Sequence, residues 1–253
     1  MSRKKKKSFN WNENDENGFS GGTTRTTSNL SLRRIEPLTR NQELTFKAYE
    51  DGYNLMLHGV AGTGKTFISM YLALRDILSG DSQYEKIIVI RSVVPSRDMG
   101  FLPGGIKDKI KAYEEPYQEI CYDLFGNSQG YNVLKSKKLV EFTSTSFLRG
   151  MTFNNAIIIV DEFQNNSFGE INTVMTRVGE NSKIIFCGDI RQTDLKKSEE
   201  KEGIRHFIEI TKRMGGFDHI EFNQSDIVRS GLVKQYLIES AKYMDEKNLN
   251  FIL

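Results

Sequence analysis

The sequence predicts an α/β fold in which a mostly parallel sheet is flanked by helices on both faces. Several short runs, such as residues 87–90 and 156–160, are apolar throughout and rich in β-branched residues, which indicates strands covered on both faces. These runs alternate along the chain with longer helical patterns. With 253 residues, 38% of them hydrophobic, the chain is long enough for one such sheet and a short appendage, but not for two catalytic domains.

The expected elements follow in order from residue 35. Thr39 can cap a helix over residues 40–51, and the apolar run 53–58 ends at a glycine, as a buried strand before a turn does. A helix then begins near Lys65. Further strands are predicted at residues 87–90, 139–142, 156–160 and 183–187, and further helices at residues 106–125, 168–178, 203–214 and 231–247.

The first 34 residues differ in composition from the rest. They contain eight basic and three acidic residues, many Ser, Thr, Asn and Gly, and few large apolar side chains. Such a segment cannot bury enough apolar surface to offset the entropy of ordering. We therefore expect residues 1–34 to be a disordered basic arm, either a tether for nucleic acid or another polyanion or a solubilising tail, with one folded domain at residues 35–253.

The composition also excludes several classes of protein. No run approaches the roughly 18 apolar residues of a membrane span, and no apolar signal segment follows the first lysines. The expectation is therefore a protein that is neither secreted nor membrane-bound, located in the cytoplasm. Cys121 and Cys187 lie in apolar surroundings, which predicts two reduced core residues.

A phosphate-binding motif directly follows the first predicted strand. The segment fits G-x-x-x-x-G-K-[ST] between a strand and a helix, which is the context that makes it a P-loop. Its glycines let backbone N–H groups face phosphates, and the helix N-terminus adds positive charge. Lys65 is expected at the β- and γ-phosphates of ATP and Thr66 on Mg²⁺. The nucleotide-binding residues are Gly59, Val60, Ala61, Gly62, Thr63, Gly64, Lys65 and Thr66.

Two consecutive acids end the strand at 156–160. Asp161 can hold Mg²⁺ together with Thr66, and Glu162 can act as general base on the attacking water. A metabolite kinase needs no such base, so Glu162 favours ATP hydrolysis. The alternative is a solvated acidic turn after a core strand.

Two glutamines extend the predicted site. Gln192 lies in the polar loop that follows the strand at 183–187, at the sheet edge where α/β proteins bind ligands, and it could sense the γ-phosphate. Gln42, on the helix before the P-loop, could read the adenine edge with its amide. The alternatives are a structural Gly-Asp turn at 188–189 and an exposed helical glutamine at 42.

The order and spacing of these segments resemble the PhoH-like family over about residues 37–240. The match consists of Gln42, the P-loop, Arg91, the segments 100–104 and 148–153, Asp161 to Asn165, the segment 188–195 and Asp226 to Arg229. The resemblance implies a RecA-like ATPase core, similar to the first motor domain of superfamily 1 helicases and linked to phosphate starvation and RNA. In size the chain is similar to short phage-encoded members, which implies the host cytoplasm.

The sequence departs from the family pattern at two positions. Ser92 stands where the family typically has Pro, and Phe163 stands where it has Ala. Neither change removes a group that contacts phosphate. ATP chemistry therefore remains the expectation, whereas the departures bear on contact with nucleic acid.

Arg229 lies where the family places an arginine that can meet transition-state charge. Too few residues follow the segment 188–195 for a second motor domain. We therefore expect a neighbouring subunit to supply Arg229 within a homo-oligomer, for example a hexameric ring. The alternative is that Arg229 caps the following helix or pairs with Asp226.

A mixture of cations and aromatic side chains between residues 96 and 117 could bind single-stranded nucleic acid. It comprises Arg97, Phe101, Lys107, Lys109, Lys111, Tyr113 and Tyr117. The alternative is an amphipathic helix with a solvated lysine face and its tyrosine edge in the core.

The leading hypothesis is an oligomeric Mg-dependent ATPase that acts on, or is stimulated by, single-stranded RNA or DNA, with helicase-like activity as one form. The alternative is a non-motor ATP switch that controls a protein partner.

Overall fold

A computed structural model describes residues 30–92, 106–193, 195 and 198–246. Six strands form one parallel sheet in the order β3-β2-β4-β5-β1-β6. The strands are β1 (Asn54–Gly59), β2 (Lys86–Arg91), β3 (Val140–Ser144), β4 (Ala156–Asp161), β5 (Lys183–Gly188) and β6 (Phe217–Phe222). The helices are α1 (Arg40–Glu50), α2 (Lys65–Ser79), α3 (Ile106–Phe125), α4 (Gly130–Ser136), α5 (Phe168–Met175), α6 (Ser198–Lys212) and α7 (Gly231–Glu246).

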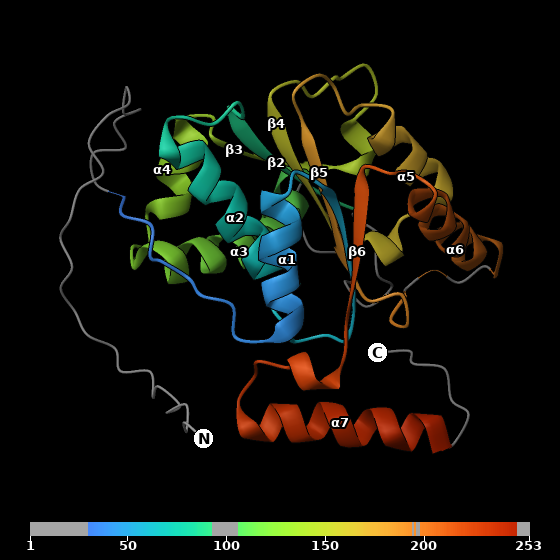
Figure 1. Cartoon of the computed structure of the whole chain (residues 1–253). Coiled ribbons are helices and arrows are strands. Elements are labelled where there is room, and N and C mark those ends of the chain that lie inside the picture. Colours follow the sequence, from blue (N-terminus) through green and yellow to red (C-terminus); the bar gives the residue numbers. More distant parts are fainter. Residues whose placement is uncertain (1–29, 93–105, 194, 196–197, 247–253) are drawn as a thin grey trace, which may run out of the picture.

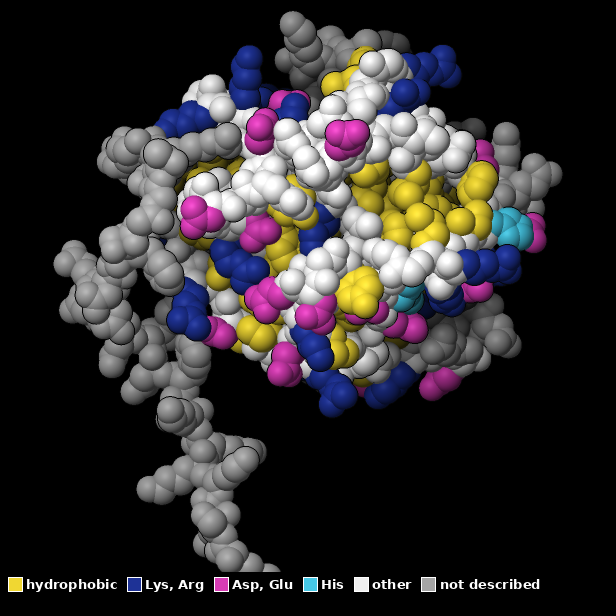
Figure 2. Space-filling view, turned by 45° about the horizontal axis from the view of Figure 1, so that its top comes forward, with side chains coloured by type: hydrophobic (Ala, Val, Ile, Leu, Met, Phe, Trp, Pro, Cys, Tyr) yellow, Lys and Arg dark blue, Asp and Glu magenta, His cyan; other side chains and the backbone are white. Residues whose placement is uncertain are grey.

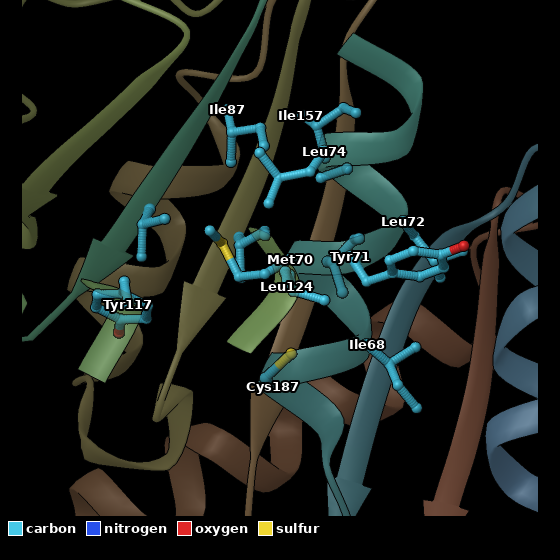
Figure 3. Close-up of a cluster of buried hydrophobic side chains, with 14 of the residues drawn as sticks. Ile68, Met70, Tyr71, Leu72, Leu74, Ile87, Tyr117, Leu124, Ile157 and Cys187 are labelled. Atoms are coloured by element: carbon cyan, nitrogen blue, oxygen red, sulfur yellow. The ribbon is translucent and has the colours of Figure 1, made fainter. Parts of the chain in front are cut away.

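The sheet separates two hydrophobic cores. Helices α1 to α4 cover one face, α5 and α6 cover the other, and α7 crosses the lower edge of the sheet in Figure 1. Successive residues of a strand enter opposite cores: Ile157 and Ile159 of β4 face α2, whereas Ile158 and Val160 face the other core. In Figure 3, side chains of α2 lie against strand residues of the first core, which include Ile157. The predicted α/β class with helices on both faces is confirmed.

The sequence prediction lacks two elements of the structure, β6 and α4. Strand β6 reads Phe-Asp-His-Ile-Glu-Phe and lies at the edge of the sheet, where only Ile220 and Phe222 are fully buried. Its alternating polar residues lack the continuous apolar pattern that identifies the central strands. Helix α4 is a seven-residue segment, too short for a reliable helical period.

The N-terminal boundary of the folded part differs from the expectation. Residues 1–29 of the expected arm lie outside the described residues. Residues 30–34 contact the core, because Leu30 and Leu32 pack against the first cluster and the Arg33 backbone N–H donates to Leu124 O at 2.9 Å. The Arg33 guanidinium also donates to Asp123 O at 3.1 Å. Leu30, Leu32 and Arg33 of the expected arm thus contact the folded domain.

The face of the molecule between the front and the top of Figure 1 carries charges of both signs. In Figure 2, basic and acidic side chains are interspersed around a group of hydrophobic side chains, without a continuous basic stripe among the residues described. Among the described helices, none combines the length and the apolarity needed to span a bilayer. Both cysteines are free and buried, as expected.

Candidate nucleotide-binding site

A pocket of about 580 Å³ lies at the carboxyl edge of the sheet. The strand ends of β1, β4 and β5 meet there, since parallel strands all terminate at the same edge. The P-loop, Asp161, Glu162 and Gln192 line it, and residues 35–38, α3 and Arg229 complete its walls. The structure therefore brings together every segment that the sequence analysis assigned to nucleotide binding or catalysis.

The P-loop requires glycine at two places for different reasons. Gly59 ends β1 with φ +112°, and a Cβ there would lie 2.0 Å from the carbonyl oxygen of Phe222 on β6. Gly64 has φ +82° and precedes the first residue of α2, a left-handed conformation that other residues rarely adopt. The chain thus passes tightly from β1 into α2, whose N-terminus faces the pocket.

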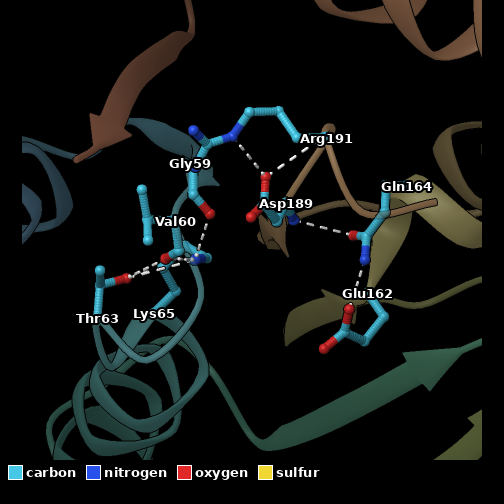
Figure 4. Close-up of polar contacts among 8 residues, drawn as sticks. All are labelled: Gly59, Val60, Thr63, Lys65, Glu162, Gln164, Asp189 and Arg191. Atoms are coloured by element: carbon cyan, nitrogen blue, oxygen red, sulfur yellow. Dashed lines mark hydrogen bonds and ion pairs between the residues drawn. The ribbon is translucent and has the colours of Figure 1, made fainter. Parts of the chain in front are cut away.

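Lys65 turns its ammonium group back into the P-loop. Its Nζ donates to the carbonyl oxygens of Gly59 and Val60, both at 2.8 Å, and to Thr63 Oγ1 at 3.3 Å (Figure 4). Burial lowers the pKa of Lys65, while the nearby carboxylate of Asp189 opposes this shift. An ammonium has three donors, so contact with a phosphate requires Lys65 to exchange some of these bonds.

Thr66 and Asp161 form the pair that fits Mg²⁺. Thr66 Oγ1 donates to Asp161 Oδ1 at 2.7 Å. Because the hydroxyl is the donor, its lone pairs remain able to ligate a metal. Hydroxyl and carboxylate oxygens are ligands that Mg²⁺ prefers. Asp161 Oδ2 accepts a second hydrogen bond, at 2.8 Å, from the hydroxyl of Tyr117.

Glu162 follows Asp161 in a left-handed backbone conformation, with φ 51°. Burial, and then the charge of Asp161, raise the pKa of Glu162, while a hydrogen bond from Gln164 opposes the shift. A raised pKa favours a group that must accept a proton near neutral pH. The strained turn and the hydrogen bond together fix the direction of this carboxylate.

Gln164 links Glu162 to the loop after β5, a contact that the sequence analysis did not identify. Its Nε2 donates to Glu162 Oε2, and its Oε1 accepts from the Asp189 backbone N–H at 3.1 Å (Figure 4). Thr193 Oγ1 donates to the Gln164 carbonyl oxygen at 2.8 Å. In the sequence, only the position of an amide two residues after an acid indicates this contact.

Gln192 lies in this same loop, in the wall of the pocket. Its backbone N–H donates to Asp189 O at 2.9 Å, which closes a tight turn, and Asp189 forms an ion pair with Arg191 at 3.3 Å. The loop agrees with the expected position of Gln192 at the pocket. It agrees equally with the alternative of a structural Gly-Asp turn.

Gln42 is buried at the pocket, not exposed on α1. Its Oε1 accepts from the Leu38 backbone N–H at 2.7 Å, and its Nε2 donates to the Thr63 carbonyl oxygen at 2.9 Å. The amide thereby joins the segment before α1 to the P-loop. One donor and one lone pair are left for an adenine edge.

Arg229 lies beside the P-loop of its own chain. The Val228 backbone N–H donates to Gly62 O at 3.0 Å, and a Cβ on Gly62 would lie 3.0 Å from Arg229 Cγ. Asp226 fixes the preceding turn, because its carboxylate accepts from Asn41 Nδ2 at 2.7 Å and from a backbone N–H. Arg229 thus lines the pocket of its own chain, whereas the sequence led us to expect it from a neighbouring subunit.

The expected nucleic-acid stripe is only partly described. Tyr117 is fully buried and cannot stack on a base, so the alternative with a tyrosine edge in the core holds for this residue. Lys111 is exposed, and the Arg91 guanidinium lies 5.7 Å from the ring centroid of Tyr113. Residues 97 and 101 and the side chains of Lys107 and Lys109 lie outside the described part.

At the two departures from the family pattern, the structure shows one residue packed in the core and one buried beside a carboxylate. Phe163 is fully buried and contacts Phe186 edge-to-face, with ring centroids 5.9 Å apart. Ser92 is 9% exposed and lies 3.5 Å from the Glu170 carboxylate.

A model of the family described as PhoH-like protein matches residues 34–240. The chain is 31% identical over 221 residues to a PhoH-like protein of Mycobacterium leprae, with 86% of this chain and 62% of the relative covered. It is 35% identical over 196 residues to Protein PhoH of Escherichia coli K12, with 76% and 54% covered. The chain thus spans between about half and two thirds of the length of these relatives.

Among solved structures, a large terminase from a thermophilic bacteriophage superposes with a TM-score of 0.51 at 13% identity. The likeness covers 79% of this chain and 50% of the terminase. It supports the fold, a RecA-like α/β domain.

Proposed function

Because the chain belongs to the PhoH-like family and carries the site of a P-loop NTPase, we propose that it binds Mg·ATP and hydrolyses it to ADP and phosphate. The observation that carries this proposal is the 2.7 Å hydrogen bond from Thr66 to Asp161, in the pocket that Lys65 and Glu162 also line. A metal ligand pair, a phosphate-binding ammonium and a candidate base thus converge in one pocket, as phosphoryl transfer to water requires.

Each residue has a role in the proposed reaction. The P-loop and Lys65 bind the phosphate chain, and Thr66 with Asp161 would hold Mg²⁺, which neutralises charge on the β- and γ-phosphates. Glu162 orients the attacking water and takes its proton. Gln192 and Arg229 contact the γ-phosphate and the charge that develops on it, and Gln42 contacts adenine.

Phosphate release from ATP tests this proposal. We expect release that requires Mg²⁺ and is abolished by EDTA and by Lys65→Ala, which removes the positive charge from the phosphate site. Lys111→Ala is the matched control, because Lys111 is an exposed lysine of α3. Release that survives Lys65→Ala would contradict the proposal.

The proposal extends to a cytoplasmic ATPase stimulated by single-stranded RNA or DNA, with a link to phosphate starvation from the family resemblance. Assembly into a homo-oligomer, a hexameric ring included, is a separate part of it. The alternative is a switch whose ATP state controls a protein partner. Single-stranded RNA or DNA should raise the hydrolysis rate under the first version and leave it unchanged under the second.

A further inference from the structure

A buried tyrosine of α3 contacts the carboxylate that the proposed function assigns to Mg²⁺. Tyr117 is fully buried, and its hydroxyl donates to Asp161 Oδ2 at 2.8 Å. Thr66 donates to the other oxygen, Oδ1, at 2.7 Å. The two oxygens of one carboxylate are therefore each fixed by a hydroxyl from a different helix.

The direction of these hydrogen bonds follows from the chemistry of the groups. An ionised carboxylate only accepts, so Tyr117 must be the donor. Burial raises the pKa of Tyr117, and the charge of Asp161 raises it further. The 2.8 Å contact therefore runs from the phenol to the carboxylate.

Neighbouring side chains restrict Tyr117 further. Arg91, at the end of β2, interacts electrostatically with the Tyr117 hydroxyl and stands next to Asp161 in the parallel register of β2 and β4. The ring of Tyr117 packs against Phe142, with centroids 5.6 Å apart. A side chain fixed by its ring and its hydroxyl can in turn fix the rotation of the Asp161 carboxylate.

We propose, on the basis of the Mg·ATP function above, that Tyr117 is a positioning residue that holds Asp161 in the orientation that binds nucleotide-bound Mg²⁺. Tyr117 acts through Asp161 and contacts neither the metal nor the nucleotide. Its loss leaves the P-loop intact and frees Asp161 Oδ2, so Asp161 samples orientations in which Oδ1 no longer faces Thr66.

Tyr131 provides a matched control within the same region. It is also a buried tyrosine, 2% exposed, and its hydroxyl donates to a carboxylate, Glu114 Oε1, at 2.7 Å. Glu114 belongs to α3 but is not among the residues that line the nucleotide pocket. Tyr131→Phe thus removes an equivalent hydroxyl without touching the proposed metal site.

The experiment measures binding of a fluorescent ADP as Mg²⁺ is titrated, and separately in EDTA. Tyr117→Phe should raise the Mg²⁺ concentration at the midpoint about 10- to 100-fold, the usual effect of losing a group that orients a metal ligand. Its affinity for the nucleotide in EDTA should equal that of the parent. Tyr131→Phe should leave both values unchanged.

Two further variants separate positioning from a general loss of packing. In an Asp161→Asn background, Tyr117→Phe should cause no additional shift, because the group through which it acts has been altered. Placing p-aminophenylalanine at position 117 keeps an N–H donor on the ring and should restore the parental midpoint.

The measurements distinguish a failure of the proposed function from a failure of the role proposed for Tyr117. If the parent protein shows no Mg²⁺-dependent nucleotide binding, the proposed function is contradicted and this inference with it. If the parent depends on Mg²⁺ but Tyr117→Phe has the parental midpoint, or shifts it equally in the Asp161→Asn background, only the inference is overturned.

Discussion

Gln164 connects two parts of the site that lie on different strands. Its amide joins the candidate base Glu162, after β4, to the backbone of Asp189, after β5. A movement of the loop that carries Gln192 can therefore shift Glu162 through the Gln164 side chain. The close approach of Gln164 to the chain depends on Gly188, where a Cβ would lie 2.2 Å from Gln164 Oε1.

Gly188→Ala should therefore slow hydrolysis while nucleotide binding persists. The added methyl group displaces Gln164 and with it Glu162, and a misplacement of about 1 Å can reduce kcat about 10²-fold. Steady-state kinetics give kcat and KM separately. Gly169→Ala is the control, because a Cβ at Gly169 meets nothing within 4 Å. An unchanged kcat for Gly188→Ala would refute this role of Gln164.

The residues of the site differ in how far sequence alone could identify them. Lys65, Thr66, Asp161 and Glu162 were predictable, because the motif spacing and the strand–loop–helix context define their chemistry. The contacts of Tyr117 were not, because they depend on the packing of α3 beside β4, which no local pattern encodes.

At the scale of elements, the central strands were predictable and the edge strand was not. Strands β2, β4 and β5 have continuous apolar cores because both of their faces are covered. Strand β6 alternates and places a histidine, His219, beside β1. His58 of β1 is 9% exposed, and its Nδ1 has no hydrogen-bond partner among the described residues.

The pairing of β1 with β6 should make folding stability depend on pH. Burial lowers the pKa of His58, and His219, Lys212 and Lys65 lower it further, against the opposing effect of Glu221. The unfolded chain therefore takes up a proton on His58 near pH 6.5, whereas the folded chain takes it up only at lower pH. The contribution of His58 to the free energy of unfolding should be constant above about pH 7 and fall as the pH drops below about 6.5.

Urea denaturation at several pH values measures this dependence. The slope below pH 6.5 should be smaller for His58→Gln, which cannot take up a proton. Parental and variant proteins with the same slope would show that His58 does not contribute.

At the scale of the whole molecule, one chain carries all the groups assigned to the site. Arg229 follows β6 and returns to the P-loop of its own chain through the hydrogen bond from Val228 to Gly62. The sequence could not reveal this return, because β6, the strand that leads the chain back to β1, was itself unrecognised. The expectation of an arginine from a neighbouring subunit rested instead on the few residues that follow the segment 188–195.

Mixing two inactive variants should therefore restore no activity. Arg229→Ala and Lys65→Ala each lack a group that the same chain must supply, so no pairing of subunits completes a site. The loss in Arg229→Ala alone can reach about 10³- to 10⁵-fold if it meets transition-state charge. Phosphate release is measured after exchange of differently tagged subunits. Activity above that of either variant would instead place Arg229 across a subunit boundary.

In the proposed reaction Asp161 holds the metal and Glu162 activates water. Glu162→Gln separates these two roles, with phosphate release and Mg²⁺-dependent binding of fluorescent ADP measured on the same preparation. We expect parental ADP binding and a hydrolysis rate lower by about 10²- to 10⁴-fold, because only the proton acceptor is lost. Hydrolysis at the parental rate would contradict this role of Glu162, since the base would then lie elsewhere.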